Sequence, residues 1–368
     1  MSATSLNPWA FDVTSLMVLI GDQEEGRLRS SRSSWIEVLI AAPVAGIQNY
    51  LKSYDAISTV AQREYFSPFG CNKAPLRNAK LDSTIKNLRL LDEGKYFVYT
   101  IKDDAGKKVH RHIYLHSLWL TLTWCWFGGL VAFWYNAPFG DLPPGTWKGI
   151  TNISVLTGWS IIVRTIELVM VEALEKANEP DSNSKDATTP GGIFFLGKRN
   201  SGLVILGTRQ AIKLWTSSRL EYDEGTTYSI LNRHVQIFIR IGTILVLLLV
   251  FVTVPNGSTT DQLVFILLNI LGQANVFLGI RLNARSCKGQ LDEQTALNDK
   301  KGVVKYRTQV YGYLIREFDG KDADPGWIDK SEMLPKTNVW EEFQTAVIKD
   351  KVTDPKVIYD ALVLASGA

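Results

Sequence analysis

A row of polar and charged side chains runs through one of the most apolar stretches of the chain, residues 149–175. At about 100° per residue on a helix, these side chains fall on one arc of roughly 140°. They are Ser154, Thr157, Ser160, Arg164, Glu167, Glu172 and Glu175. Because an isolated charge in hydrocarbon is costly, this face must turn toward protein or water rather than lipid.

Two interpretations of this polar face remain open. In the first, the face lines a transport pathway in which Glu167 accepts a cation or a proton and Arg164 sets its affinity or its pKa, with Ser160 and Thr157 as further lining groups. In the second, Arg164 and Glu167 lie three residues apart and pair with each other, while the hydroxyls hydrogen-bond between helices.

The last apolar run of the chain also carries amide side chains. Gln262, Asn269 and Gln273 share one helical face, and Gly272 beside them allows a neighbouring helix to approach closely. Amides in a bilayer need hydrogen-bond partners. They either bond the serine and threonine side chains of the polar face or line a narrow pore, and in the second case Asn269 and Gln273 contribute to the pathway.

Three histidines are expected at one membrane level. His112 and His116 lie four residues apart at the start of the first apolar run, and His234 precedes the third. Such a group is able to bind a metal ion, or two of its members a haem, although interfacial histidines more often contact headgroups. The chain has only four histidines, which excludes the histidine-rich di-iron membrane enzymes. We expect no cofactor, and a non-enzymatic role is favoured.

The elements that position these residues are four apolar runs at 114–135, 149–171, 235–254 and 262–280. Each has about the 20 residues that a helix needs to cross the hydrocarbon layer. The short links "NAPFGDLPPGT" and "PNGSTTD" have the composition of tight turns. The sequence therefore predicts a mainly α integral membrane protein, with four transmembrane helices in two hairpins.

The basic residues predict the orientation of the four helices. Lys148 is the only basic residue between the paired runs, whereas Lys107, Lys108, Arg233 and Arg281 flank the opposite ends of the runs. By the positive-inside rule, both termini and the long middle segment face the cytosol. We expect the plasma membrane or an endomembrane as the location.

Three segments outside the runs form the expected cytosolic region of mixed α/β structure, namely 1–113, 172–234 and 282–368. The first contains an apolar stretch at 35–51, broken by Pro43, which is interpreted as an interfacial or docked helix in preference to a re-entrant segment. The middle segment predicts a β-hairpin around "KRNSG" and then a helix. The last predicts β-structure in "VVKYRTQVYGYLI" and helices in "NVWEEFQTAVIKD" and "DPKVIYDALVLAS".

Composition limits the classes of partner that the chain is expected to bind. The net charge of +3 and the lack of a basic stripe exclude nucleic acid. Cys71, Cys125 and Cys287 are too far apart for a disulfide framework or a zinc site. The expected partners are the lipid bilayer, further copies of the chain, and cytosolic proteins. Further copies are expected because four helices alone enclose too little space for a pore.

The stretches "FLGKRNSGLVILGTRQAIKLWTSSRLEY" and "ANVFLGIRLNARSC" resemble segments of uncharacterised multipass membrane proteins of filamentous fungi. The resemblance covers about the central half of the chain and implies a multipass fold without an activity. Transport or channel-like function is the leading hypothesis. A non-transporting membrane scaffold or regulatory subunit is the alternative, and a membrane-embedded redox or biosynthetic enzyme that uses the histidines is the second alternative.

Overall fold

The computed structural model describes residues 29, 35–42, 47–51, 63–102, 110–136, 143–177, 188–217, 227–294, 303–321 and 323–366. The chain divides into two compact units. The helical unit consists of Met1–Thr59, Lys107–Asn178 and Arg219–Asn283, and the α/β unit consists of Val60–Gly106, Glu179–Ser218 and Ala284–Ala368. Each unit is described by itself.

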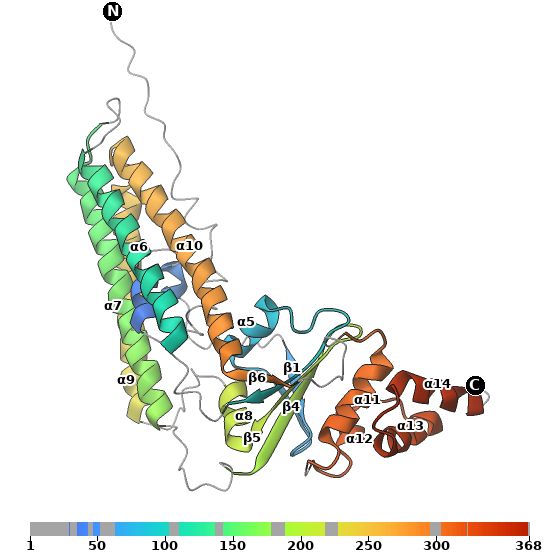
Figure 1. Cartoon of the computed structure of the whole chain (residues 1–368). Coiled ribbons are helices and arrows are strands. Elements are labelled where there is room, and N and C mark those ends of the chain that lie inside the picture. Colours follow the sequence, from blue (N-terminus) through green and yellow to red (C-terminus); the bar gives the residue numbers. More distant parts are fainter. Residues whose placement is uncertain are drawn as a thin grey trace, which may run out of the picture. The chain divides into compact units, whose positions relative to one another are not determined.

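The helical unit is built on four long helices that lie side by side in Figure 1. They are α6 (His110–Asn136), α7 (Trp147–Ala177), α9 (Thr227–Thr253) and α10 (Thr259–Gly289). Each contains a stretch long and apolar enough to cross a membrane, at Tyr114–Asn136, Trp147–Val169, Arg233–Thr253 and Thr259–Gly289. The chain is therefore a multi-pass membrane protein, and each predicted apolar run falls on one of these helices.

The long helices expose apolar side chains on their outer surface and bury others between them. On α9, Leu245 and Phe251 are 62% and 64% exposed, as expected of side chains that meet lipid. Between α7 and α9 the packing is close at Gly242, where an added Cβ would lie 2.1 Å from the Trp159 ring. Small residues at such crossings are typical of membrane helices.

Two short helices of the N-terminal segment pack against the long ones. The helix α3 (Trp35–Ala41) contacts α6 and α7, and the 3-10 helix η1 (Ile47–Leu51) contacts α9. Val38 and Ile47 are fully buried there. The single interfacial or docked helix expected over 35–51 is thus replaced by two docked pieces, because a proline inside a helix removes a hydrogen bond and clashes with the preceding turn.

The α/β unit contains a six-stranded sheet of order β2-β1-β4-β5-β3-β6. Its strands are β1 (Glu64–Ser67), β2 (Asn72–Pro75), β3 (Tyr96–Ile101), β4 (Pro190–Leu196), β5 (Gly202–Thr208) and β6 (Leu291–Gln294). The β3–β5 pair is parallel and the other pairs are antiparallel. Strands from three separate parts of the chain therefore complete one sheet, and β4 and β5 form a hairpin where the sequence predicts one.

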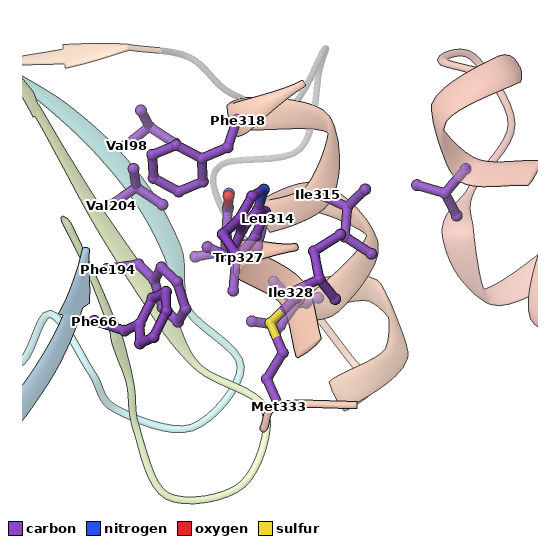
Figure 2. Close-up of a cluster of buried hydrophobic side chains, with 14 of the residues drawn as sticks. Phe66, Val98, Phe194, Val204, Leu314, Ile315, Phe318, Trp327, Ile328 and Met333 are labelled. Atoms are coloured by element: carbon purple, nitrogen blue, oxygen red, sulfur yellow. The ribbon is translucent and has the colours of Figure 1, made fainter. Parts of the chain in front are cut away.

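Helices cover both faces of this sheet. The helices α5 (Ala79–Asn87) and α8 (Arg209–Thr216) cover one face, and α11 (Arg307–Phe318), α12 (Trp327–Ser331) and α13 (Asn338–Lys349) cover the other, with α14 (Pro355–Ser366) packed on α11 and α13. Figure 2 shows Phe194 and Val204 of the sheet facing Leu314, Phe318 and Trp327 of the helices. Two covered faces explain the nearly continuous apolar run "GLVILGT" of β5.

The β-structure predicted for "VVKYRTQVYGYLI" is wrong, because most of this stretch is the helix α11. Its buried side chains Val310, Leu314, Ile315 and Phe318 have the spacing of one helical face. The Gln309 side chain accepts a hydrogen bond from the backbone N–H of Tyr306 at 3.1 Å and so caps the helix start. Aromatic and β-branched residues suggested a strand, but packing against the sheet favours the helix.

Candidate functional site

Part of the polar face of α7 turns into the helical unit, whereas Ser154 at its start is exposed. Thr157, Ser160, Arg164 and Glu167 are all buried, and Arg164 is 0% and Glu167 4% exposed. These four predicted site residues therefore lie together on one buried face, where charged groups avoid lipid. The side chains of residues 170–177, with Glu172 and Glu175, lie outside the described residues.

The ion-pair partner of Glu167 comes from the N-terminal segment. The Arg29 guanidinium bonds the Glu167 carboxylate through Nη2 to Oε1 and through Nε to Oε2, the second at 3.4 Å. Both side chains are buried, with 2% and 6% of their side-chain areas exposed. The ion pair that one interpretation of the sequence offered joined Glu167 to Arg164 instead, because Arg29 lies 138 residues away and only the fold brings it to α7.

Two further groups contact the Arg29 guanidinium. Its Nη1 donates a hydrogen bond to the Asn49 carbonyl oxygen, and its Cζ lies 4.1 Å from the centroid of the Tyr50 ring. Asn49 and Tyr50 belong to η1. We call the Glu167 carboxylate, the Asn49 carbonyl and the Tyr50 ring together the guanidinium cradle. The two oxygen groups accept hydrogen bonds from the guanidinium nitrogens, and the ring lies against the guanidinium plane.

Arg164 places a second guanidinium beside the guanidinium cradle. Its Nη1 donates to Ser160 Oγ, and its Cζ lies 5.5 Å from the Tyr50 ring centroid. One aromatic face is thus close to two arginines. Coulomb repulsion between them in a medium of low dielectric is offset by Glu167, which lies one helical turn from Arg164.

Buried polar atoms near this face that lack a hydrogen-bond partner among the described residues include Thr157 Oγ1 on α7 and Asn49 Nδ2 on η1. A buried polar group without a partner costs about 1–3 kcal/mol, so such atoms mark places where water or a solute is favoured. The polar face is therefore incompletely satisfied by the part of the protein that the structure describes.

The structure describes the surroundings of the two α10 amides that the sequence places on the pathway. Asn269 is half-buried and donates to the Phe265 carbonyl of its own helix at 2.8 Å, and Gln273 is half-buried. A further amide of α10, Asn275, bridges helices: it accepts from Thr123 Oγ1 at 3.3 Å and donates to the Ile40 carbonyl at 2.9 Å. It ties α6, α10 and α3 together and satisfies an orphan carbonyl at the end of α3.

Sequence reasoning also missed Asp261 at the other end of α10. Its carboxylate accepts from Trp134 Nε1 at 2.8 Å, from Thr146 N and Oγ1 at 2.9 and 2.6 Å, and from Ser258 N at 2.8 Å. These bonds join the link before α7 to the link before α10. The pattern Ser258-Thr-Thr-Asp261 before an apolar run is a capping-box signature and was the available signal.

The three predicted metal-ligating histidines are distributed as follows. The side chain of His112 lies outside the described residues, His234 is exposed, and His116 Nε2 lies 3.9 Å from Glu37 Oε1. Within the described ranges, no group of three or more His, Cys, Asp or Glu side chains is placed to hold a metal ion. A histidine site remains a prediction from the sequence.

Comparison with protein-family models, with curated proteins and with solved structures finds no match for the chain. The resemblance to multipass proteins of filamentous fungi accordingly stays a prediction. The functional argument therefore rests on the buried charges and hydrogen-bonding groups of the helical unit.

Proposed function

We propose that the protein is a transport or channel-like membrane protein whose polar pathway follows the inward face of α7. The observation that carries the proposal is the pair of buried, unpartnered atoms Thr157 Oγ1 and Asn49 Nδ2 beside the charged residues of that face. Buried polar groups without a hydrogen-bond partner in the protein favour bound water. A hydrated polar face along a membrane helix is the environment in which a solute can cross.

In this proposal Glu167 is the cation-binding group of the pathway. A carboxylate near the end of a transmembrane helix attracts cations from one side, and Arg164 at one turn's distance limits how tightly they are held. Ser160 and Thr157 continue the polar face toward the middle of the Trp147–Val169 span. Arg29 is paired with Glu167, and in this proposal it takes the place of the cation and closes the pathway.

The orientation proposed for this pathway follows the positive-inside rule. Both termini and the α/β unit face the cytosol, and Glu167 lies toward that side of the membrane. The pore of such a protein needs more than one copy of the chain, because four transmembrane helices surround little space.

The test is cation flux into liposomes that contain the purified protein. We compare the wild type with Arg29→Ala and with the double variant Arg29→Ala/Glu167→Gln. The matched control is Arg63→Ala, which breaks the Arg63–Asp82 pair of 2.7 Å in the α/β unit. Flux that rises in Arg29→Ala, disappears in the double variant and is unchanged in the control supports the proposal.

A membrane scaffold or regulatory subunit is the second candidate. It is favoured by the apolar side chains Val357 and Leu364, which lie seven residues apart on one face of α14 and are 57% and 83% exposed. If folded protein shows no flux in any of the four forms, the ion pair only holds the helical unit together, and the scaffold replaces transport as the function.

A further inference from the structure

We infer that the guanidinium cradle is a binding site for an organic cation of the guanidinium class, and that Arg29 fills it as a tethered occupant. The inference rests on the proposed function, because it names the class of cation that the pathway accepts at Glu167. It also predicts that a cation binds at this site, and this binding can be measured without a flux assay.

The contacts of Arg29 define the chemistry that the cradle recognises. Both oxygens of Glu167 meet the guanidinium fork through Nη2 and Nε, and the Asn49 carbonyl accepts from Nη1. A flat cation with donors on three sides matches this set, and the Tyr50 ring at 4.1 Å adds attraction to its face. An alkali ion or a simple ammonium uses fewer of these groups, so the planar cation is preferred.

The walls of the cradle do not depend on Arg29. Glu167 belongs to α7, and Asn49 and Tyr50 belong to η1, which is held against α9. Ile47 is buried among side chains of the long helices, and Tyr50 packs in a cluster with Val163 and Ile239. Arg29 therefore enters a preformed site, and its replacement leaves the three recognition groups in place.

The cradle lies near one end of the apolar span of α7 rather than in its middle. Glu167 is two residues from the end of the Trp147–Val169 span, and Ser160 and Thr157 continue from it toward the centre. A cation bound there is at the entrance of the proposed pathway. Arg164 beside it opposes a second positive charge, so free cations bind weakly and are released readily.

Tethering explains why Arg29 occupies the site. A group on the same chain acts at an effective concentration in the millimolar range, so it excludes a free cation of similar intrinsic affinity. Removing the guanidinium of Arg29 should open the site to an added cation. Arg29→Ala vacates Cγ, Cδ and the guanidinium, and the free molecule of that shape is ethylguanidinium.

The experiment measures the melting temperature of purified Arg29→Ala in detergent during titration with millimolar ethylguanidinium. We expect a saturable rise of roughly 2–4 °C. Ethylammonium and sodium ions at equal concentration should give a smaller rise or none. Wild type, in which Arg29 fills the cradle, and Arg63→Ala, which lacks a different arginine, should show no saturable rise.

The double variant Arg29→Ala/Glu167→Gln separates the cradle from general effects of the ligand. Loss of the ethylguanidinium response in this variant supports the inference, whereas an equal response in both overturns it. If Arg29→Ala does not fold alone, it is purified with ethylguanidinium present, and Arg29→Gln is titrated in parallel. Folding that no added cation restores, together with an unresponsive Arg29→Gln, overturns the inference.

Flux of radiolabelled guanidinium through Arg29→Ala liposomes then distinguishes the two proposals. A saturable rise in melting temperature without flux supports the cradle as a guanidinium site and contradicts the transport function. Flux of inorganic cations without any thermal response to ethylguanidinium keeps the transport function and removes the cradle as a guanidinium site.

Discussion

At the scale of single residues, the buried ion pair shows how far sequence reasoning reaches. Glu167 and Arg164 were recognisable as charges inside an apolar run, and both are buried on one face of α7. The partner Arg29 was not, because it lies in a serine-rich basic stretch that reads as solvated. Helical arithmetic finds neighbours within a helix, but a contact across 138 residues depends on the whole fold.

Asp261 supplies a residue-scale prediction. Its carboxylate accepts four hydrogen bonds, from Trp134, from both donors of Thr146 and from Ser258. Asp261→Ala leaves these donors without an acceptor, and we expect a loss of about 3 kcal/mol in stability. Thermal unfolding in detergent measures the loss. Asp360→Ala, which removes an exposed pair with Lys356, should change little, and an equal effect of the two variants would contradict the prediction.

Tyr99 supplies a prediction about pH. Burial, and then the charge of Glu293, raise the pKa of Tyr99 above its ordinary value of 10.0. The phenol is neutral in the folded protein, whereas the unfolded chain ionises at about pH 10. The stability from this shift is fully present below that pH and is lost as pH rises.

The measurement for Tyr99 is the melting temperature across the alkaline range, with the absorbance of tyrosinate followed in parallel. Tyr99→Phe cannot ionise, so its melting temperature should fall less steeply between about pH 9 and pH 12 than that of the wild type. Identical slopes for the two proteins would show that Tyr99 does not contribute.

At the scale of elements, apolar length was a sufficient signal for the long helices, and local pattern predicted the short helices α13 and α14 but not α11. The four spans follow from runs that only a membrane or a buried helix permits. The stretch that forms α11 contains tyrosines and valines that suit a strand equally well, and its packing against the sheet decides the outcome. A short local pattern of apolar and aromatic residues leaves the choice between strand and helix open.

Two glycines in the middle of long helices give a matched prediction. Gly242 on α9 lies against the Trp159 ring, where a Cβ would be 2.1 Å away, whereas nothing lies within 4 Å of a Cβ at Gly158 on α7. Gly242→Ala should therefore destabilise the protein by about 1–3 kcal/mol through overpacking. Gly158→Ala should be neutral or stabilise it by up to about 1 kcal/mol, because alanine favours the helix.

Thermal unfolding of both glycine variants in the same detergent checks the prediction. Near-ultraviolet circular dichroism adds a direct probe, since Trp159 must move in Gly242→Ala and not in Gly158→Ala. If the two variants have the same melting temperature, α7 and α9 do not approach each other closely at Gly242.

At the scale of the whole molecule, the proposed orientation is open to chemical labelling. Cys71 lies in the α/β unit and is partly exposed, and Asn256 lies exposed in the link before α10. A membrane-impermeant maleimide should label Asn256→Cys in intact cells. Cys71 should react only after the membrane is opened. Labelling of Cys71 in intact cells would reverse the orientation.

The composition of the sheet also sets an order of events during synthesis. The strand β3 pairs with β5 and β6, which leave the ribosome roughly 100 and 190 residues after it, with the membrane helices inserted in between. While α6 and α7 insert, the apolar strand "YFVYTI" has no neighbour on either edge, and the edge that pairs with β6 stays open until α10 has been made. The nascent chain therefore exposes an unpaired strand edge during membrane insertion, and a chaperone that shields this edge would control how much protein matures.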